Sequence, residues 1–328
     1  MSNVEPTIAG GRAGARKASG QAASPDTEST PLLDLASGEP IITVNGQTSP
    51  TTGSAARSTG LRRRQVFGLS FVDAPSLAPV VDMLLHRPPL DNPDHQDDTV
   101  LTPNVDIMVQ LTVPGANRTI DWRMYQRSRY CLPDGRPIVA ASKILGAPLQ
   151  ARLTGSELFA VLWPRLVAGR RATMVVASSD QIAERLQSEY PDGRFLVAPM
   201  FDADDRSTVD QMAKHVIESA DGGQLEYLLL GIGHPKDARI SAAVLAHWND
   251  DLGRPPTILG LGAASSMYVG IIKRAPQWVQ RIGMEWFHRF LQEPRRLFRR
   301  YFVRDVAFFP LVWRLWRSGR TTRVEIEE

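Results

Sequence analysis

Short apolar runs alternate with helical patterns through most of this 328-residue chain, and no other feature constrains its fold as strongly. We expect strands at residues 66–69, 99–101, 173–177, 195–197, 227–231 and 257–260. We expect helices at residues 76–86, 105–111, 138–145, 156–167, 180–190, 207–220 and 237–250. Apolar strands that are separated by helices are typical of a parallel sheet buried on both faces. The pattern therefore predicts an α/β fold with a largely parallel sheet flanked by helices.

Residues 1–64 differ from the rest because they are rich in Gly, Ala, Ser, Thr and Pro and poor in aromatic residues. Such a segment buries too little apolar surface to offset the entropy lost on ordering. We expect a disordered tail over residues 1–64 and an α/β body over residues 65–270. The triplet Arg62-Arg63-Arg64 is either a solvated boundary or a patch that touches a membrane. We expect neither a signal peptide nor a spanning helix, since no apolar run is suitable for either.

The last part of the chain is basic and aromatic. Between positions 270 and 323, thirteen Lys or Arg residues stand against three acidic residues, although the whole chain carries only +3. Trp and Phe beside a basic face are typical of a helix that lies in a membrane interface. We therefore expect a basic, amphipathic helical appendage over residues 271–328 that binds an anionic membrane surface. A cut after Tyr301 should then spare the body, because every expected core strand lies upstream.

Two alternatives exist for this appendage. The first is a pair of helices that packs on the body. The second is a tail that binds nucleic acid, since interleaved aromatic residues and arginines can stack and pair with single strands. We rank the second last, and expect no nucleic-acid partner, because nothing upstream resembles a nucleic-acid module.

The single cysteine, Cys131, excludes an internal disulfide and any multi-cysteine metal site, and it is typical of a protein from a reducing compartment. Asp202-Ala203-Asp204 could hold a divalent metal against a nucleotide diphosphate. Acidic residues just before a helix are also stabilised by its dipole, and we favour that explanation. We expect no metal site and no cofactor.

Three segments could bind a ligand. Two of them, after residues 101 and 230, follow expected strands, and the carboxyl ends of parallel strands meet at one edge of the sheet. Thr102 and Asn104 could hydrogen-bond a substrate, although Asn104 could simply cap the next helix. Asp134-Gly135 could be only a turn. In Gly231-Ile232-Gly233-His234-Pro235-Lys236, glycine lets backbone N–H groups approach a phosphate, but the loop is neither a Walker nor a dinucleotide-binding motif.

Near its carboxyl terminus the chain reads KRAPQW at residues 273–278, GMEW at 283–286 and QEPRRLFRRY at 292–301. Upstream, and in the matching order, lie Thr102-Pro103-Asn104, Pro133-Asp134-Gly135 and Gly231-x-Gly233-x-Pro235-Lys236. With these motifs the chain resembles the WecG/TagA/CpsF family of bacterial glycosyltransferases over about residues 66–303.

The resemblance implies an inverting transfer of a sugar from a UDP-sugar to a polyprenyl-diphosphate-linked acceptor, in the synthesis of a cell-surface glycan. The sugar would be N-acetylmannosamine, its uronate, or a hexose such as glucose. The resemblance also implies a Rossmann-like body, a reaction without metal, and a peripheral enzyme at the cytoplasmic face of the inner membrane.

The resemblance also suggests roles for individual residues. Asp134 would be the general base that takes the proton of the acceptor hydroxyl. Arg289, Arg296 and Arg299 would bind a diphosphate, and their spacing puts them on one face if the helix runs on. The other substrate-binding residues that we expect are Thr102, Asn104, Gly231, Gly233 and Lys236.

The chain departs from the family at three pairs of residues and at one insertion. Asp237-Ala238 replaces the usual Gln-Glu, Ser265-Ser266 the usual Phe-Asp, and Ser178-Ser179 a frequent Gly-Gly, while residues 88–98 resemble an insertion. These changes concern recognition of the donor. The alternative function is that of a catalytically silent scaffold in a polysaccharide-assembly complex. The sequence leaves the oligomeric state open, including a homo-oligomer.

Overall fold

The computed structural model describes residues 61–89, 97–112, 118–220, 225–273, 275–276, 279 and 284–318. Most of the expected disordered tail, at residues 1–60, lies outside this range, as do residues 90–96 of the expected insertion and residues 319–328 of the appendage.

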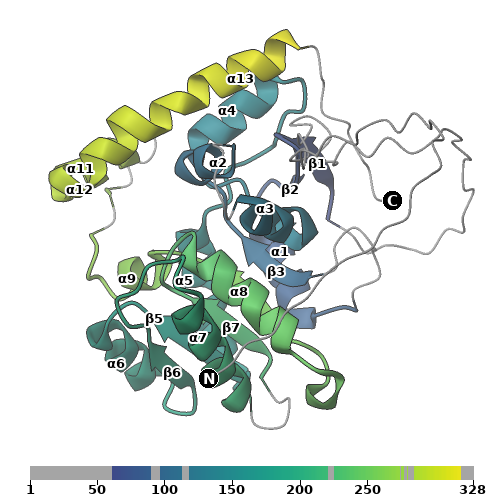
Figure 1. Cartoon of the computed structure of the whole chain (residues 1–328), viewed down its shortest axis with the longest axis vertical. Coiled ribbons are helices and arrows are strands. Elements are labelled where there is room, and N and C mark those ends of the chain that lie inside the picture. Colours follow the sequence, from purple (N-terminus) through teal and green to yellow (C-terminus); the bar gives the residue numbers. More distant parts are fainter. Residues whose placement is uncertain are drawn as a thin grey trace, which may run out of the picture. The chain divides into compact units, whose positions relative to one another are not determined.

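Within the described residues, eight strands form one sheet (Figure 1). They are β1 (Arg63–Val66), β2 (Leu69–Val72), β3 (Asp97–Leu101), β4 (Ser128–Cys131), β5 (Thr173–Ala177), β6 (Arg194–Val197), β7 (Tyr227–Leu230) and β8 (Thr257–Gly260). Their order is β1-β2-β4-β3-β8-β7-β5-β6, and only the β1–β2 pair is antiparallel. The expected α/β fold with a largely parallel sheet is thus confirmed.

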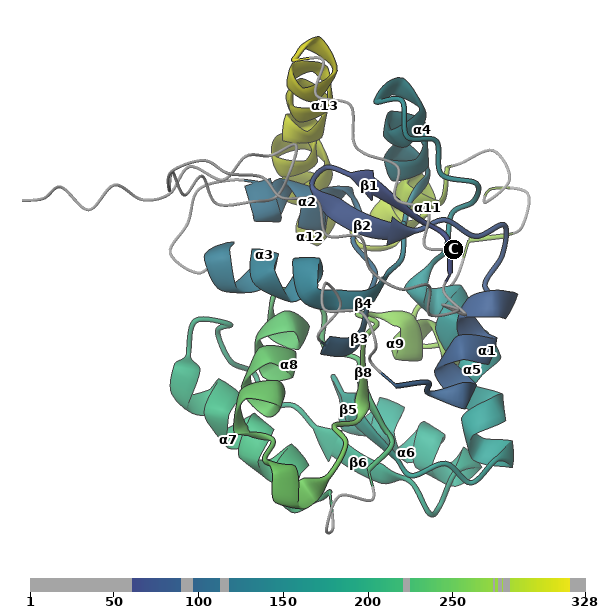
Figure 2. The same cartoon turned by 90° about the vertical axis from the view of Figure 1, so that its right-hand side faces the viewer.

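Helices cover both faces of this sheet (Figure 2). They are α1 (Ala78–His86), α2 (Val105–Thr112), α3 (Arg118–Arg127), α4 (Arg136–Ile144), α5 (Gly155–Ala168), α6 (Asp180–Glu189), α7 (Arg206–Glu218), α8 (Lys236–His247) and α9 (Ala264–Tyr268). Alternate strand residues face opposite layers: Val175 of β5 and Leu229 of β7 pack toward α1, α5 and α6, whereas Val176 and Leu228 pack toward α7 and α8. Burial on both faces explains why these strands are apolar throughout.

The first expected strand, at residues 66–69, is only partly right, because Val66 ends β1, Leu69 begins β2, and Phe67-Gly68 form the turn between them. Phe67 and Gly68 both have positive φ, at 58° and 77°. Two such residues give a turn whose twist matches that of the flanking strands. The arginine triplet belongs to this hairpin: Arg62 and Arg64 lie 3.2 and 2.8 Å from Asp73 Oδ2, whose side chain is buried. These contacts favour a structural role for the triplet over a membrane patch.

Residues 118–131 contain α3 and β4, which the apolar pattern did not predict. The sequence of α3, RTIDWRMYQR, is mostly polar, and β4, SRYC, carries an arginine at its second position. Parallel pairing with β3 and β2 on its two sides makes β4 a central strand of the sheet. Tertiary pairing therefore outweighs a weak local signal.

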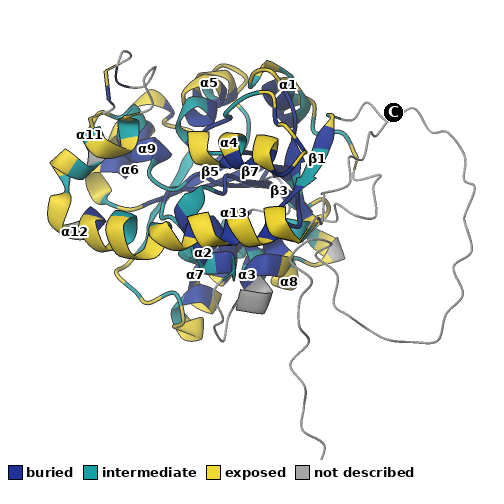
Figure 3. Ribbon diagram, turned by 90° about the horizontal axis from the view of Figure 1, so that it is seen from above, coloured by how far each residue is buried: buried dark blue, intermediate teal, exposed yellow. Residues whose placement is uncertain are grey.

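The appendage consists of α11 (Glu285–Gln292), α12 (Pro294–Phe298), a π-helical turn (Arg299–Arg304), a 3₁₀ turn (Asp305–Ala307) and α13 (Phe308–Arg317). Helix α13 packs one face on the body, where Phe308, Leu311, Val312 and Leu315 are buried in a cluster with residues of β1, β2, α2 and α4. The opposite face is exposed (Figure 3). The appendage therefore contributes to the core, so the expectation that a cut after Tyr301 spares the body is not supported.

Candidate active site

A cavity of about 870 Å³ lies at the carboxyl ends of the central strands, between the body and the appendage. The loops that follow β3, β4, β7 and β8 form its floor and walls, and the appendage contributes Trp286, His288, Arg300, Tyr301 and Phe302 among others. Ligands bind at this edge of open α/β sheets, because the loops there diverge and their backbone groups are free to reach a ligand.

The structure brings together five residues that the sequence singled out: Thr102, Asn104, Asp134, Gly231 and Gly233 all line the cavity. Lys236 does not line the cavity. Its ammonium lies over the ring of Phe201 instead, 4.4 Å from the centroid.

The three arginines expected to bind a diphosphate do not share one helix. Helix α11 ends at Gln292, and Glu293 breaks the helical path with φ −136° and ψ 58° before α12 begins. The side chains of Arg289 and Arg296 lie outside the described residues. Arg299 is exposed to solvent, and its neighbour Arg300 lines the cavity.

Asp134 is held by the backbone of neighbouring segments. Its own N–H donates to the carbonyl of Pro103 at 3.1 Å, and its Oδ2 accepts the N–H of Gly155 at 3.3 Å. Gly135 has φ 135°, a conformation that favours glycine, so the Asp-Gly pair also serves as the turn that starts α4. Burial raises the pKa of Asp134 to about 6, although the Gly155 hydrogen bond and the charge of Arg152 oppose this shift.

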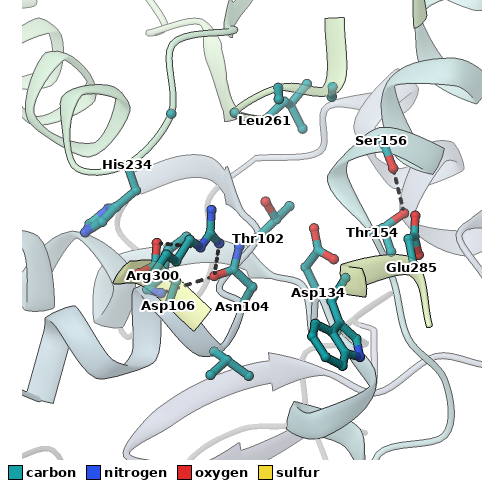
Figure 4. A pocket seen from close by; sticks show the side chains of 18 of the residues that line it. Thr102, Asn104, Asp106, Asp134, Thr154, Ser156, His234, Leu261, Glu285 and Arg300 are labelled. Carbon is teal, nitrogen blue, oxygen red and sulfur yellow. Dashed lines mark hydrogen bonds and ion pairs between the residues drawn. The ribbon is translucent and has the colours of Figure 1, made fainter. Parts of the chain in front are cut away.

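Asn104 both caps a helix and faces the cavity. Its Oδ1 accepts the N–H of Ile107 at 3.1 Å, so the capping role is confirmed. The same oxygen lies 3.5 Å from Arg300 Nη2, so Asn104 also contacts a cation of the appendage (Figure 4). Thr102 lies deeper, with its hydroxyl 3.4 Å from the carbonyl of Gly260.

The glycine loop after β7 approaches its neighbours closely. A Cβ at Gly231 would lie 2.6 Å from Ser265 Oγ and 3.2 Å from the carbonyl oxygen of Val176, so a side chain here would force a shift. Gly233 has φ 79° and no atom near its missing Cβ, so its backbone faces open space. Gly231 thus allows close packing against Ser265 and Val176, whereas Gly233 leaves room beside the backbone, as a bound phosphate or sugar would need.

Ionic contacts tie the appendage to both sides of the cavity, and sequence reasoning did not identify them. On one side, Arg152 Nη1 donates to Glu285 of α11 at 2.7 Å, and Arg152 Nη2 lies 3.5 Å from Glu157 of α5. On the other side, the buried Asp106 lies 3.3 Å from Arg300 Nε and 2.7 Å from Arg304 Nε. Figure 4 shows Asp106, Arg300 and Asn104 side by side and Glu285 at the opposite end.

A second buried carboxyl lies in the cavity wall. Burial raises the pKa of Asp237 to about 7, and burial lowers the pKa of the nearby His234 to about 3. His234 Nδ1 lies 3.3 Å from the hydroxyl of Tyr125 and 3.9 Å from Asp237 Oδ1. His234 is therefore a neutral imidazole at physiological pH.

Asp202 and Asp204 lie in the exposed loop before α7. Asp202 Oδ1 accepts the N–H of Asp204 at 2.9 Å, and the carboxylate of Asp204 pairs with Arg239. Both carboxylates thus have protein partners. Within the described part of the chain, no three His, Cys, Asp or Glu side chains gather as in a metal site. The expectation of a reaction without metal stays a prediction.

Comparison with known proteins gives a family for most of the chain. A model of the "Glycosyl transferase WecG/TagA/CpsF family" matches residues 64–322. Relatives in Bacillus spizizenii and Bacillus subtilis are 25% identical over 197 residues and 27% over 175, and one in Staphylococcus aureus (strain MRSA252) is 23% identical over 180. The matches cover 55%, 52% and 54% of this chain and 71%, 63% and 66% of those proteins. Each relative is named N-acetylglucosaminyldiphosphoundecaprenol N-acetyl-beta-D-mannosaminyltransferase.

Proposed function

Because this chain belongs to the WecG/TagA/CpsF family of glycosyltransferases, we propose that it transfers a sugar from a UDP-sugar to a polyprenyl-diphosphate-linked acceptor, with inversion at the anomeric carbon. The names of its relatives support N-acetylmannosamine as one candidate sugar and an undecaprenyl-diphosphate-linked acceptor. The observation that carries the proposal is the half-buried Asp134 carboxyl, with its raised pKa, in a cavity that also contains cations of the appendage.

In the proposed reaction, Asp134 takes the proton of the acceptor hydroxyl while that oxygen forms a bond to the anomeric carbon. The bond from the anomeric carbon to the UDP oxygen breaks at the opposite face, and UDP leaves with the electron pair. A base with a pKa near the working pH suits this role, since it is ionised before the reaction yet accepts a proton during it. The hydrogen bond from Gly155 fixes the carboxyl in one orientation.

The charge that develops on the leaving diphosphate requires cations or N–H groups close by. Arg300 and Lys273 reach the cavity from the appendage side, and Arg152 lies beside Asp134. Arg300 is oriented by Asp106 and Asn104, so its guanidinium is positioned before the substrate binds. The appendage would thus complete the active site as well as cover it.

The direct test is UDP release by the full chain with a panel of UDP-sugars and a polyprenyl-diphosphate-linked acceptor. Asp134→Asn should lower kcat by roughly 10²–10⁴, the usual contribution of a general base. Asp82→Asn, an exposed carboxylate on α1, is the matched control and should not change kcat. Loss of less than about threefold in Asp134→Asn would contradict the assignment. A folded protein that turns over no donor would favour the scaffold alternative.

We also propose that the appendage binds an anionic membrane surface at the cytoplasmic face, where the lipid-linked acceptor would lie. The exposed face of α13 carries Phe309, Trp313 and Trp316, which are 70%, 56% and 59% exposed, next to Arg314 and Arg317. Aromatic side chains with flanking arginines are suited to a headgroup interface. None of the described helices is long and apolar enough to span a bilayer.

Co-sedimentation with vesicles of anionic phospholipid tests this surface. Replacing Phe309, Trp313 and Trp316 together by serine should reduce the bound fraction at least fivefold, and added salt should weaken binding of the unchanged protein, because surface charges are screened. Val161→Ser on α5 is the control, since Val161 is 41% exposed on a different helix. Full sedimentation of the triple variant would place the membrane contact elsewhere.

A further inference from the structure

We propose that Asp237 binds the hydroxyl groups of the donor sugar and selects a neutral sugar over a uronate. This inference rests on the proposed function and names the class of donor for the same site. It makes Asp237 a specificity-determining residue, distinct from the base and from the cations of the appendage.

The first observation is the position of Asp237 in the wall of the cavity. Asp237 lies in the first turn of α8, is only 4% exposed and lines the cavity. A Cβ on Gly260 would lie 3.3 Å from Asp237 Oδ2, and the carbonyl of the same glycine accepts from Thr102 Oγ1 at 3.4 Å. One backbone residue thus separates the Asp237 carboxyl from Thr102.

Thr102 also lies close to Asp134, the proposed general base. A Cβ on Gly155 would lie 3.2 Å from Thr102 Oγ1, and the N–H of Gly155 donates to Asp134 Oδ2 at 3.3 Å. The anomeric carbon must lie close to Asp134, where the acceptor hydroxyl loses its proton. Thr102 and Gly260 therefore lie between Asp134 and Asp237. With the anomeric carbon at Asp134, the rest of the sugar ring can reach Asp237.

The surroundings of Asp237 suit sugar hydroxyls better than a diphosphate. Its Oδ1 accepts the N–H of Ala238 at 2.7 Å, and a carboxyl has further lone pairs to accept from a ligand. Its neighbour His234 is neutral, and the charge that shifts the pKa of Asp237 is the carboxylate of Asp121, which raises it further. A buried carboxyl without a cation repels phosphate oxygens, whereas hydroxyl groups donate to it.

The residues that differ from the family pattern also line this cavity. One residue of each departing pair, namely Ser178, Asp237 and Ser266, lines the cavity. Each presents a short side chain with a hydroxyl or carboxyl group. A change of donor recognition would require such changes to lie together, although they are separated by up to 88 positions in the sequence.

A uronate would bring a second carboxylate close to the buried Asp237. Above the pKa of Asp237, about 7, its carboxylate and that of a uronate would repel each other, so a uronate donor would be rejected there. A neutral donor keeps a hydroxymethyl group at the same carbon and avoids this repulsion.

The test compares two matched donor pairs: UDP-N-acetylmannosamine with UDP-N-acetylmannosaminuronate, and UDP-glucose with UDP-glucuronate. For the unchanged protein at pH 8.5, where Asp237 is ionised, kcat/KM should favour the neutral member of the preferred pair by roughly 100-fold or more. Asp237→Asn should lower kcat/KM for the neutral donor by roughly 10–100-fold and narrow the preference by at least tenfold. Asp180→Asn is the matched control, because Asp180 begins α6 after β5 but is exposed.

Calorimetric binding gives a second readout that does not depend on turnover. Asp237→Asn should weaken binding of the neutral UDP-sugar but leave the Kd of UDP unchanged within about threefold, since UDP lacks the sugar. An equal loss of affinity for UDP would place the nucleotide at Asp237 and overturn the inference, and an unchanged donor preference would overturn it as well. Absence of turnover with every donor would count against the proposed function, and the binding comparison would still decide the role of Asp237. Circular dichroism of both variants checks that they fold.

Discussion

At the scale of single residues, the environment of a carboxyl decides its chemistry. Asp134 and Asp237 line one cavity, and burial raises the pKa of both, whereas the exposed Asp205 caps α7 and has a lowered pKa because Thr208 donates to it. The same side chain therefore serves as a base candidate, a sugar-contact candidate or a helix cap, according to burial and hydrogen bonding.

The pH dependence of the reaction should report Asp134. The base acts only when ionised, so kcat/KM should fall tenfold per unit as the pH drops below the pKa of Asp134, about 6. Above that pKa, kcat/KM should no longer rise with pH. The measurement is kcat/KM for UDP release between pH 5 and pH 8.5. A limb centred near pH 4, the range of an ordinary carboxylate, would show that burial does not act on the catalytic group.

Arg300 and Arg299 are adjacent but should differ in effect. Arg300 lines the cavity and contacts Asn104, whereas Arg299 is exposed. We expect Arg300→Ala to lower kcat/KM by roughly 10–100-fold, because a charge-assisted contact to the diphosphate is lost. Arg299→Ala should change it by less than threefold. Parallel UDP-release assays of the two variants compare these effects. A larger loss for Arg299→Ala than for Arg300→Ala would favour Arg299, the arginine that the sequence predicted.

At the scale of elements, the appendage is fixed by opposite charges at its two ends and by apolar packing along α13. Arg152 with Glu285 secures α11, and Asp106 with Arg300 and Arg304 secures the segment before α13. The buried face of α13 then packs on the β1–β2 hairpin, where Phe308 and Phe67 have ring centroids 5.6 Å apart. Docking of the appendage therefore depends on contacts distant in sequence.

The pH should affect this docking through Asp305. Burial and the charge of Asp106 raise the pKa of Asp305 to about 6, so the folded state binds a proton more readily than the unfolded state between about pH 4 and pH 6. This contribution to stability is present at low pH and is lost as the pH rises through 6. Asp305→Asn resembles the protonated form, so its Tm should exceed that of the unchanged protein by about 1–3 °C at pH 7.5 and match it at pH 4.5. A lower Tm at pH 7.5 would contradict this sign.

Truncation after Tyr301 should destabilise the body. It removes Phe308, Leu311, Val312 and Leu315 from the core, and each large buried side chain stabilises by roughly 2–5 kcal/mol. We expect the Tm to fall by about 10 °C or more, whereas the serine triple variant of the exposed face should stay within about 2 °C. Thermal unfolding followed by circular dichroism measures both. An unchanged Tm on truncation would mean that α13 packs only weakly.

At the scale of the whole molecule, the body supplies the Asp134 carboxyl and the appendage supplies Arg300 and Lys273 to one cavity. This division would let the protein work without a divalent metal, because arginines can stabilise the leaving diphosphate. Turnover should then be unchanged in EDTA. If EDTA abolished it and Mg²⁺ or Mn²⁺ restored it, Asp202 and Asp204 would become ligand candidates, which Asp202→Asn would test.

Local sequence patterns are sufficient for the α/β class and for the residues at the strand ends. Strands β5, β7 and β8 are buried on both faces, so their continuous apolar runs can be recognised from the local sequence alone. Parallel strands place their carboxyl ends at one edge, so the expected strands are enough to group Thr102 and Asn104 with Gly231 and Gly233. Asp134 follows β4, which the apolar pattern does not predict. The hairpin, α3 and β4 are not predictable in this way, because their apolar signal is weak and pairing partners decide their conformation.

Tertiary packing, in contrast, selects the appendage residues that reach the site. Arg152 meets Glu285 across 133 positions, and Arg300 meets Asn104 across 196, and no local spacing encodes such pairs. The arginine spacing predicted one helical face, but the break at Glu293 and the π-helical turn from Arg299 change the helical phase. As a result Arg300 faces the cavity while Arg299 faces solvent. Local patterns determine most of the secondary structure, whereas this break, the π-helical turn and the contacts of Arg300 with Asp106 and Asn104 determine where those arginines point.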